Sequence, residues 1–184
     1  MNTTTFGCSG MHGGEQSRPD FQLCPPLQQL KQEHIPLRIA MNAFHATAET
    51  FLSDPGTARN DSFAALYGQV AEFTEQLKKH SRKEDDGLFP LMAKYIGSVV
   101  GPIAVMTYEH EQAEQNLQRF LDAAGERESG SENEDAATIA GYAVQAYSIL
   151  TQHFNKEEQV LFPMAENILS PEDKEQLDSI VQEQ

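Results

Sequence analysis

Apolar residues recur at steps of three and four along four long stretches of the chain. Such steps follow the 3.6-residue period of an amphipathic helix, whereas a strand alternates at every second residue. The four apolar stripes are Leu27, Leu30, Leu37, Met41, Phe44, Ala48 and Phe51; Leu66, Val70, Phe73, Leu77 and Leu91; Ile103, Met106, Leu117 and Leu121; and Ile139, Tyr142, Ala146, Ile149, Val160 and Met164. The pattern therefore predicts an all-α fold with four long helices.

The polar segments between the stripes predict the connections and the limits of the domain. The runs SDPGTARND, IGSVVGP and DAAGERESGSENED have loop composition, and connections this short favour an up-down-up-down four-helix bundle. Ser170 predicts an N-cap, with Pro171 in the first turn of a short terminal helix that begins at about residue 171. Residues 1–24 are rich in Gly, Ser and Thr without a helical period. They predict a flexible N-terminal arm and leave residues 25–184 for the bundle.

Polar side chains interrupt each apolar stripe at positions that should face the core. The interrupting residues are His34, His80, Glu84, His110, His153 and Glu157. One histidine on an apolar face is usually a hydrogen-bonded core residue, and a His–Glu pair one turn apart can be a simple helix contact. Six such groups buried together would cost roughly several kcal/mol for each ionised one, whereas a cation takes imidazoles and carboxylates as ligands. The pattern predicts a metal site; a hydrogen-bonded core without metal is the alternative.

The polar pattern occurs twice in the chain. HSRKEDDGLFP at residues 80–90 is matched by HFNKEEQVLFP at residues 153–163, and QEHIPL in the first stripe is matched by YEHEQA in the third. Two helix pairs, each with one His followed by His-x-x-x-Glu, predict pseudo-twofold packing around two metal ions, with the two glutamates placed to bridge them. Each LFP proline should disturb its helix one turn back, near Asp86 and Gln159, and is assigned no chemical role.

These motifs resemble those of the hemerythrin-like proteins of the HHE cation-binding family, over about residues 27–168. The motifs that carry the resemblance are the two Glu-His pairs ending at His34 and His110, the two His-x-x-x-Glu pairs and the LFP that follows each. The resemblance implies a non-haem di-iron site in a four-helix bundle, with two iron ions as the cofactor and dioxygen or nitric oxide as the small ligand. Members of the family bind or sense these gases, buffer or store iron, or assist the repair of iron–sulfur centres.

The chain departs from the oxygen-carrying members of that family in two places. Carriers have His-x-x-x-His on the third helix, whereas this chain has Glu114 four residues after His110, so Glu114 is either a seventh metal ligand or a solvated residue. Carriers end with His-x-x-x-x-Asp, whereas this chain has acids at both spacings. One helical turn is nearer to four residues than to five, which favours Glu157 as the ligand over Glu158.

Composition and charge narrow the partners and the compartment. With 28 acidic against 13 basic residues, the formal net charge of −15 disfavours nucleic acid and anionic membranes. No apolar run approaches the roughly 18–20 residues of a membrane helix. Cys8 and Cys24 are too few for a disulfide framework, so a cytoplasmic location is expected. With His12 they match neither a common zinc site nor the N-terminal cysteine domain of the repair proteins, and His45 is expected to be a boundary residue.

Two functional hypotheses follow from these features. The first is a binding protein: a di-iron module that binds or senses dioxygen or nitric oxide, or buffers iron. The alternative is a di-iron enzyme of the oxidase or peroxidase type, or an iron–sulfur cluster repair protein. Nitrogen ligands suit reversible oxygen binding and carboxylates favour iron(III), and the predicted ligand set lies between these extremes.

Overall fold

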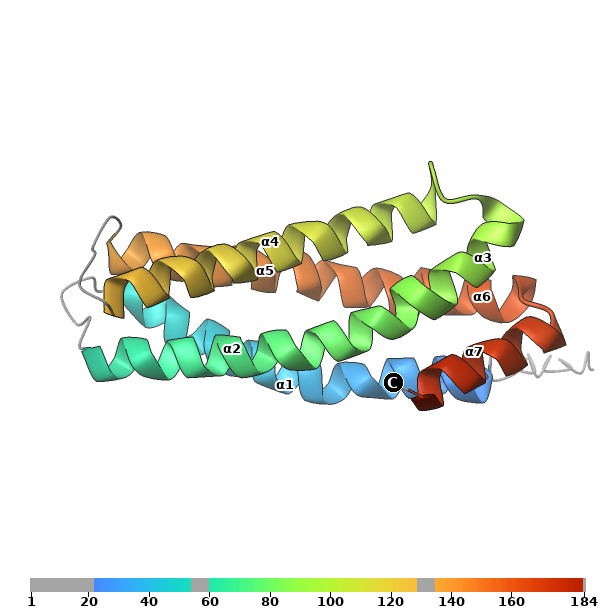
Figure 1. The fold of residues 1–184 in the computed structure, drawn as a ribbon, viewed down its shortest axis with the longest axis horizontal. Coiled ribbons are helices and arrows are strands. Elements are labelled where there is room, and N and C mark those ends of the chain that lie inside the picture. The colour runs from blue at the N-terminus through green and yellow to red at the C-terminus, as the bar shows by residue number, and fades with distance from the viewer. Residues whose placement is uncertain (1–21, 54–59, 129–134, 184) are drawn as a thin grey trace, which may run out of the picture.

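The computed structural model describes residues 22–53, 60–128 and 135–183, and these residues form helices and short links, with no strand among them. Four long helical stretches run alternately up and down the bundle (Figure 1). They are α1 (Pro25–Ser53), α2 (Asn60–Lys83) continued by α3 (Phe89–Ile96), α4 (Pro102–Glu128), and α5 (Ala136–Lys156) continued by α6 (Phe162–Ile168). A short helix, α7 (Pro171–Glu183), folds back along the bundle. The predicted all-α, up-down-up-down architecture with a short terminal helix is confirmed.

The predicted apolar stripes form most of the core. Every residue of the first and second stripes is buried, as are Ile103, Met106 and Leu117 of the third. The fourth stripe is wrong at one position, because Val160 is 52% exposed while Leu161 is buried. Helix α4 also extends to Glu128, through the first half of the segment that was predicted to be a loop.

The buried position moves from Val160 to Leu161 because the helix contains a widened turn there. A widened turn precedes the proline of each LFP motif. Residues Glu84–Leu88 (η2) and Glu157–Leu161 (η3) are π-helical, and the backbone N–H of the next phenylalanine donates to the glutamate carbonyl five residues back. The proline has no N–H to offer the carbonyl four residues before it, at Asp86 or Gln159. The predicted disturbance is confirmed at both places. A π turn holds more residues than an α turn, so it rotates the residues that follow and moves the core position on by one.

Helix α7 packs across η2 and α1. Ser170 Oγ accepts a hydrogen bond from Asp173 N at 3.1 Å, which confirms the predicted N-cap. The Asp173 carboxylate in turn accepts from Lys94 Nζ at 2.8 Å and from the Tyr95 hydroxyl, both on α3. These two hydrogen bonds hold the pKa of Asp173 well below its usual range. The first turn of α7 is therefore fixed to α3 by charged and polar contacts.

Gly87 allows α7 to approach η2 closely. A Cβ atom at Gly87 would lie 3.1 Å from Ile180 Cγ2 and 3.2 Å from Leu177 Cδ1, closer than most Cβ contacts. A larger residue at Gly87 would require these two side chains of α7 to give way by at least a few tenths of an ångström. Contact between these elements thus depends on the missing side chain.

A polar layer divides the buried apolar residues into two clusters. The larger cluster extends from the layer to the C-terminal end of α1 and the N-terminal end of α2. It includes Met41, Phe44, Phe73, Leu117 and Phe120. The smaller cluster lies on the other side, beneath α3, α6 and α7, and includes Leu27, Leu30, Met92, Phe162 and Leu177. The polar residues between them are the histidines and glutamates that interrupt the predicted stripes.

Residues 1–21 of the predicted arm lie outside the described part of the chain. Its last residues lie against the bundle: Leu23 is buried, and the backbone N–H of Cys24 donates to Glu166 Oε2 at 2.6 Å. No helix in the described residues combines the length and apolarity needed to cross a lipid bilayer.

Candidate metal centre

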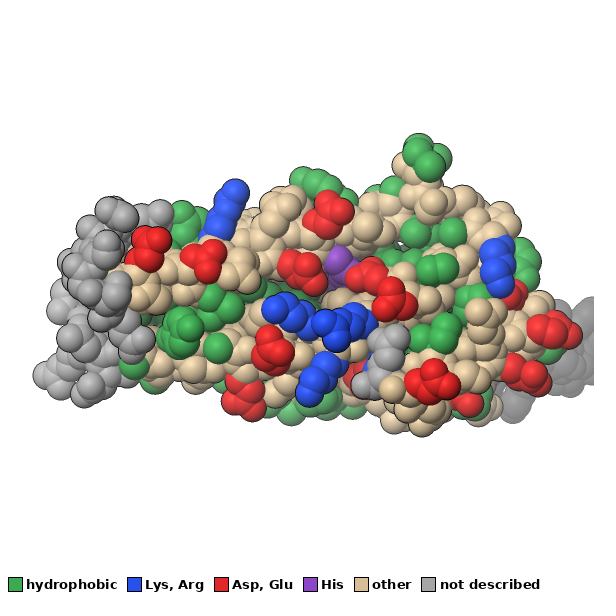
Figure 2. Space-filling model, in the orientation of Figure 1, with side chains coloured by type: hydrophobic (Ala, Val, Ile, Leu, Met, Phe, Trp, Pro, Cys, Tyr) green, Lys and Arg blue, Asp and Glu red, His purple; other side chains and the backbone are tan. Residues whose placement is uncertain are grey.

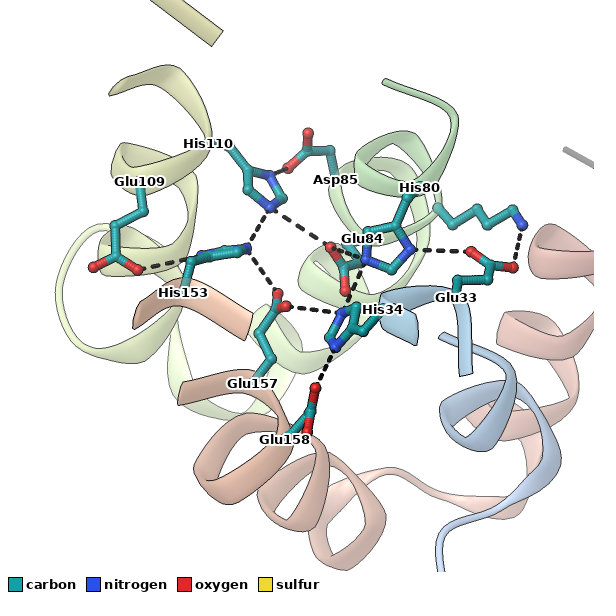
Figure 3. Close-up of polar contacts among 11 residues, drawn as sticks. Glu33, His34, His80, Glu84, Asp85, Glu109, His110, His153, Glu157 and Glu158 are labelled. Carbon is teal, nitrogen blue, oxygen red and sulfur yellow. Dashed lines mark hydrogen bonds and ion pairs between the residues drawn. The ribbon is translucent and has the colours of Figure 1, made fainter. Parts of the chain in front are cut away.

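Six of the seven predicted ligand residues meet at the centre of the bundle (Figure 3). They form two groups whose ligand atoms lie within 4.8 Å of one another: His34, His80, Glu84 and Glu157, and Glu84, His110, His153 and Glu157. The histidines come from α1, α2, α4 and α5, and the two glutamates are the first residues of η2 and η3. Both glutamates belong to both groups, and each of the six residues is at most 5% exposed.

The imidazoles point their Nε2 atoms at one another and at the glutamates. The Nε2 atoms of His34 and His80 are 3.1 Å apart, and those of His110 and His153 are 2.9 Å apart. Glu157 lies between the two pairs, with Oε2 3.3 Å from His34 Nε2 and Oε1 3.1 Å from His153 Nε2. Glu84 lies between them on the other side, with Oε2 at 3.5 Å from His80 and 3.6 Å from His110.

A carboxylate holds the other ring nitrogen of each of the four histidines in the cluster. The Nδ1 contacts are His34 with Glu158 at 2.9 Å, His80 with Glu33 at 3.0 Å, His110 with Asp85 at 3.0 Å, and His153 with Glu109 at 3.2 Å. An ionised carboxylate can only accept, so the proton of each neutral imidazole lies on Nδ1. Each Nε2 therefore presents a lone pair to the centre.

With neutral imidazoles and ionised glutamates, the centre collects hydrogen-bond acceptors without donors. Both carboxylate oxygens of Glu84 and of Glu157 are buried without a hydrogen-bond partner. Four imidazole lone pairs converge on the same space. Such an arrangement is unfavourable by itself and is what a pair of cations requires, since neutral imidazole and carboxylate are ligands for transition metals. The donor set therefore fits a two-cation site.

Protons take the place of cations when the cluster holds no metal. Burial and the neighbouring Glu157 charge raise the pKa of Glu84 well above its usual value. Burial opposes the charge of His153, but attraction to Glu157 outweighs it and raises the pKa of His153 to about 9. Burial also opposes the charge of Glu157, yet His153 and His34 hold the pKa of that carboxyl well below its usual value. A cation held by these residues would displace these protons.

Two lysines complete the polar layer, one in each half of the repeat. Lys83 Nζ donates to Glu33 Oε1 at 2.6 Å, and Lys156 Nζ contacts Glu109 in the same way. Burial works against the charge of Glu33, but hydrogen bonds from His80 and Lys83 lower its pKa to about 2. These residues were not assigned a role from the sequence. Their signal was present in the repeat, as the acid before each first histidine and the lysine before each glutamate ligand.

Glu114 lies outside the cluster, on the exposed side of α4. The buried face of α4 runs from His110 to Ala113 and Leu117, so it takes a step of three residues after the histidine. The step of four, which brings Glu84 and Glu157 inward on their helices, turns Glu114 outward. The candidate ligand set therefore contains six residues and omits Glu114.

Two other candidates also lie away from the Nε2 atoms. Glu158 reaches the outer nitrogen of His34 and is paired with Arg38 at 3.0 Å, so it supports a histidine instead of pointing to the centre. His45 stacks on Tyr147 with ring centroids 3.8 Å apart and is 27% exposed, as expected of a boundary residue. Cys8 and His12 fall outside the described residues.

Aromatic rings cover the imidazoles. Phe154 and Phe162 both stack on His34, with ring centroids 4.3 Å and 5.6 Å from the centre of the imidazole. The ring of Phe89 lies 5.4 Å from that of His110. Six apolar residues from the predicted stripes, Leu37, Met41, Phe73, Leu77, Met106 and Leu117, are all buried. The phenylalanines nearest to the site were missed, because two of them belong to LFP motifs that had been given a structural role only.

Comparison with known proteins agrees with this arrangement. The family model described as the hemerythrin HHE cation-binding domain matches residues 26–165. The iron–sulfur cluster repair protein YtfE of Musicola paradisiaca is 31% identical over 111 residues, which cover 57% of this chain and 50% of the relative. The iron–sulfur cluster repair protein DnrN of Neisseria gonorrhoeae is 33% identical over 67 residues, which cover 35% and 43%.

The chain spans about half the length of the curated relatives it matches. No solved structure matches it. The family match covers most of the bundle and includes all six residues of the cluster. The chain therefore belongs to the hemerythrin HHE cation-binding family.

Proposed function

We propose that this protein is a non-haem di-iron protein that binds dioxygen or nitric oxide. The observation that carries the proposal is the pair of buried glutamates, each without a hydrogen-bond partner and each shared by two pairs of imidazoles. One ion would be held by His34 and His80, and the other by His110 and His153. Glu84 and Glu157 would bridge the two ions.

Mixed nitrogen and carboxylate ligands support iron as the metal, since both suit iron and neither is the soft thiolate that selects copper(I). Bound iron supplies one-electron chemistry toward dioxygen and nitric oxide. The chain's own residues set the conditions for that chemistry. The four outer carboxylates fix the imidazole rings and raise their basicity. The phenylalanine rings against His34 and His110 place apolar surface beside the ligand atoms.

Anaerobic loading with iron(II) tests the proposal. We expect two iron ions per chain by elemental analysis, and optical spectra that change on addition of dioxygen and of nitric oxide. Glu157→Gln should lose iron, whereas His45→Ala, far from the cluster, should keep it. Absence of iron binding, or iron that binds without any response to either gas, would contradict the proposal. Sustained turnover with peroxide would instead favour the oxidase or peroxidase alternative.

A second candidate function is the repair of damaged iron–sulfur clusters. The names of the two curated relatives favour it. Under this hypothesis the buried pair of ions would act as a source of iron or as a trap for nitric oxide.

Recovery of an iron–sulfur enzyme inactivated by nitric oxide tests this second candidate. The iron-loaded protein should restore activity faster than the same amount of free iron(II). The matched control is the iron-free Glu157→Gln variant with the same total iron in solution. Equal recovery from the protein and from free iron(II) would remove the repair hypothesis and leave the gas-binding proposal unaffected.

A further inference from the structure

Two surface hollows flank the cluster at related places in the repeat. One has a volume of about 450 Å³ and reaches His34, and the other has a volume of about 510 Å³ and reaches His110. The two histidines are the first ligands of the two halves, and each is followed four residues later by a hollow-lining residue. That residue is Arg38 in the first half and Glu114 in the second. The repeat thus builds two similar approaches with opposite charge.

The approach to His34 is closed to cations by a fixed guanidinium. Arg38 donates to Asn155 Oδ1 and Glu158 Oε1, both at 3.0 Å, and its guanidinium carbon lies 5.4 Å from the centre of the Phe154 ring. Lys31 lines the same hollow. Glu158, the one acid of this hollow, is neutralised by the ion pair with Arg38. A hydrated cation therefore meets positive charge and an aromatic ring on this side.

The approach to His110 has the opposite character. Asp85, Glu111 and Glu114 line it, and no Lys or Arg does. Figure 2 shows acidic side chains gathered around a surface-visible histidine between α4 and α2, with lysines and arginines along the neighbouring edge of α2. His110 forms the inner wall of the hollow, and the unpartnered carboxylate of Glu84 lies behind it, 3.6 Å from His110 Nε2. The negatively charged hollow thus leads toward a buried carboxyl group that has no hydrogen-bond partner.

From this asymmetry we propose that divalent metal ions reach the buried centre through the acidic hollow beside His110. Hydrated cations collect between Glu111, Glu114 and Asp85, lose water there, and pass His110 to Glu84. A swing of the His110 imidazole, which would break the 3.0 Å contact of its Nδ1 with Asp85, would open the path without breaking the bundle. The assignment rests on the proposed metal centre and adds the direction from which it fills.

Rates of metal uptake test the charge of the hollow. Cobalt(II) is a suitable probe, because its absorption changes when imidazole and carboxylate replace water. In the metal-free protein, the double variant Glu111→Gln/Glu114→Gln should take up cobalt(II) about tenfold more slowly at low ionic strength, with the difference shrinking as salt is added. The matched control is Glu72→Gln/Glu75→Gln on α2, which removes the same net charge from exposed positions outside the hollow. Its uptake rate should stay near that of the unaltered protein.

A steric variant tests the path independently of charge. Ser98 lines the hollow, whereas the neighbouring Val99 is 89% exposed and does not. Ser98→Trp should slow uptake at every salt concentration, and Val99→Trp should not. Both are in the link between α3 and α4, so neither burdens the core.

The outcomes separate the path from the site. Slower uptake in the acidic double variant and in Ser98→Trp, with two cobalt ions still bound at equilibrium, supports the proposal. Two ions bound at unchanged rates in both variants would overturn the path and leave the metal centre intact. Failure of the unaltered protein to bind cobalt(II) or iron(II) at all would overturn both.

Discussion

The two π-helical turns of the molecule begin alike and end differently. Each starts with a glutamate of the central cluster, at Glu84 in η2 and Glu157 in η3, and each follows with an acid that holds a histidine Nδ1. Three residues after the glutamate, η2 has Gly87 beneath α7, whereas η3 has Val160, which is 52% exposed. The two turns are therefore equivalent toward the centre of the bundle and unequal toward its surface.

This difference separates what the site needs from what the surface adds. The inner positions repeat the residue type, because both glutamates must enter the same space and both following acids must face an imidazole. The outer positions are free to differ, and the chain uses that freedom twice: α7 covers one turn only, and Arg38 and Glu114 give the two approaches opposite charge. The two halves of the repeat are thus alike at the positions that face the candidate ligands. They differ at the positions that face solvent or α7.

The largest effect is expected from exchanging the first acid of either turn. Glu84→Gln or Glu157→Gln should lose both metal ions, since each glutamate is shared by both groups of ligands. Asp85→Asn and Glu158→Gln, one residue further along, should keep both ions with lower affinity, because they act through a histidine. Elemental analysis of the purified variants measures this. If Glu158→Gln emptied the centre while Glu157→Gln did not, the assignment of the ligand in η3 would be reversed.

The next effect tests whether the two halves are equal around the ligands. Glu33 and Glu109 occupy equivalent places, each between a histidine Nδ1 and a lysine. Glu33→Gln and Glu109→Gln should each weaken metal binding about 10- to 100-fold. Titration against a chelator of known affinity measures both. If one variant weakened metal binding by about 10- to 100-fold and the other did not, the two halves of the outer layer would not contribute equally to metal binding.

A third prediction exchanges the unequal residues of the two turns. Gly87→Val should lower the free energy of unfolding by about 1–3 kcal/mol, because its side chain would press into Leu177 and Ile180 of α7. The reverse exchange, Val160→Gly, should cost only roughly 0.5–1 kcal/mol through greater backbone freedom. Denaturant unfolding of the metal-free variants measures both. Gly68→Ala is the control, since nothing lies within 4 Å of a Cβ there, and it should not destabilise the protein.

The smallest effect concerns the contact that fixes α7 over one turn only. The pKa of Asp173 is held below its ordinary value of 3.8 by Lys94 and Tyr95, so its contribution to stability is present above that value. It is lost as the pH falls through 3.8 toward the lower folded pKa. Asp173→Asn should therefore lower Tm at neutral pH, by an amount that shrinks in acid.

Thermal unfolding of the metal-free protein between pH 7 and pH 3 measures this difference. Glu175→Gln, an exposed acid on the same helix, is the control. A Tm difference that stayed constant over this pH range would show that Asp173 acts through its shape as an N-terminal helix residue and not through its charge.

Helical periodicity was enough to predict the bundle and six residues of its centre. A period near 3.6 identifies the inward face of a straight helix, and the interrupting polar residues lie on that face in all four helices. The same fixed period failed at Val160, because a π-helical turn contains more residues than an α-helical turn and so shifts the buried face away from the regular 3.6-residue period. It also could not decide the orientation of Glu114, since a spacing of four from the histidine points inward at Glu84 and Glu157 but outward on α4.

The outer layer depends on contacts that the spacing along one helix does not contain. Glu158 meets His34 across 124 residues, and Glu109 meets His153 across 44. Both contacts depend on which helices are neighbours and on their rotation. The sequence carried a hint in the repeated Glu-His and Lys-Glu pairs, but adjacent residues point to different sides of a helix, so neither pair reveals which distant residue it meets.

The polar layer across the middle of the bundle has a consequence for cooperativity. It separates two apolar clusters, which share helices but are joined at the layer by lone pairs in place of apolar contacts. A cation bound there would tie all four helices together at one point, so opening at one end would be felt at the other. Without the cation, we expect amides on the two sides of the layer to exchange their hydrogens in separate opening events. The bound cation would then also make the two ends of the bundle unfold together.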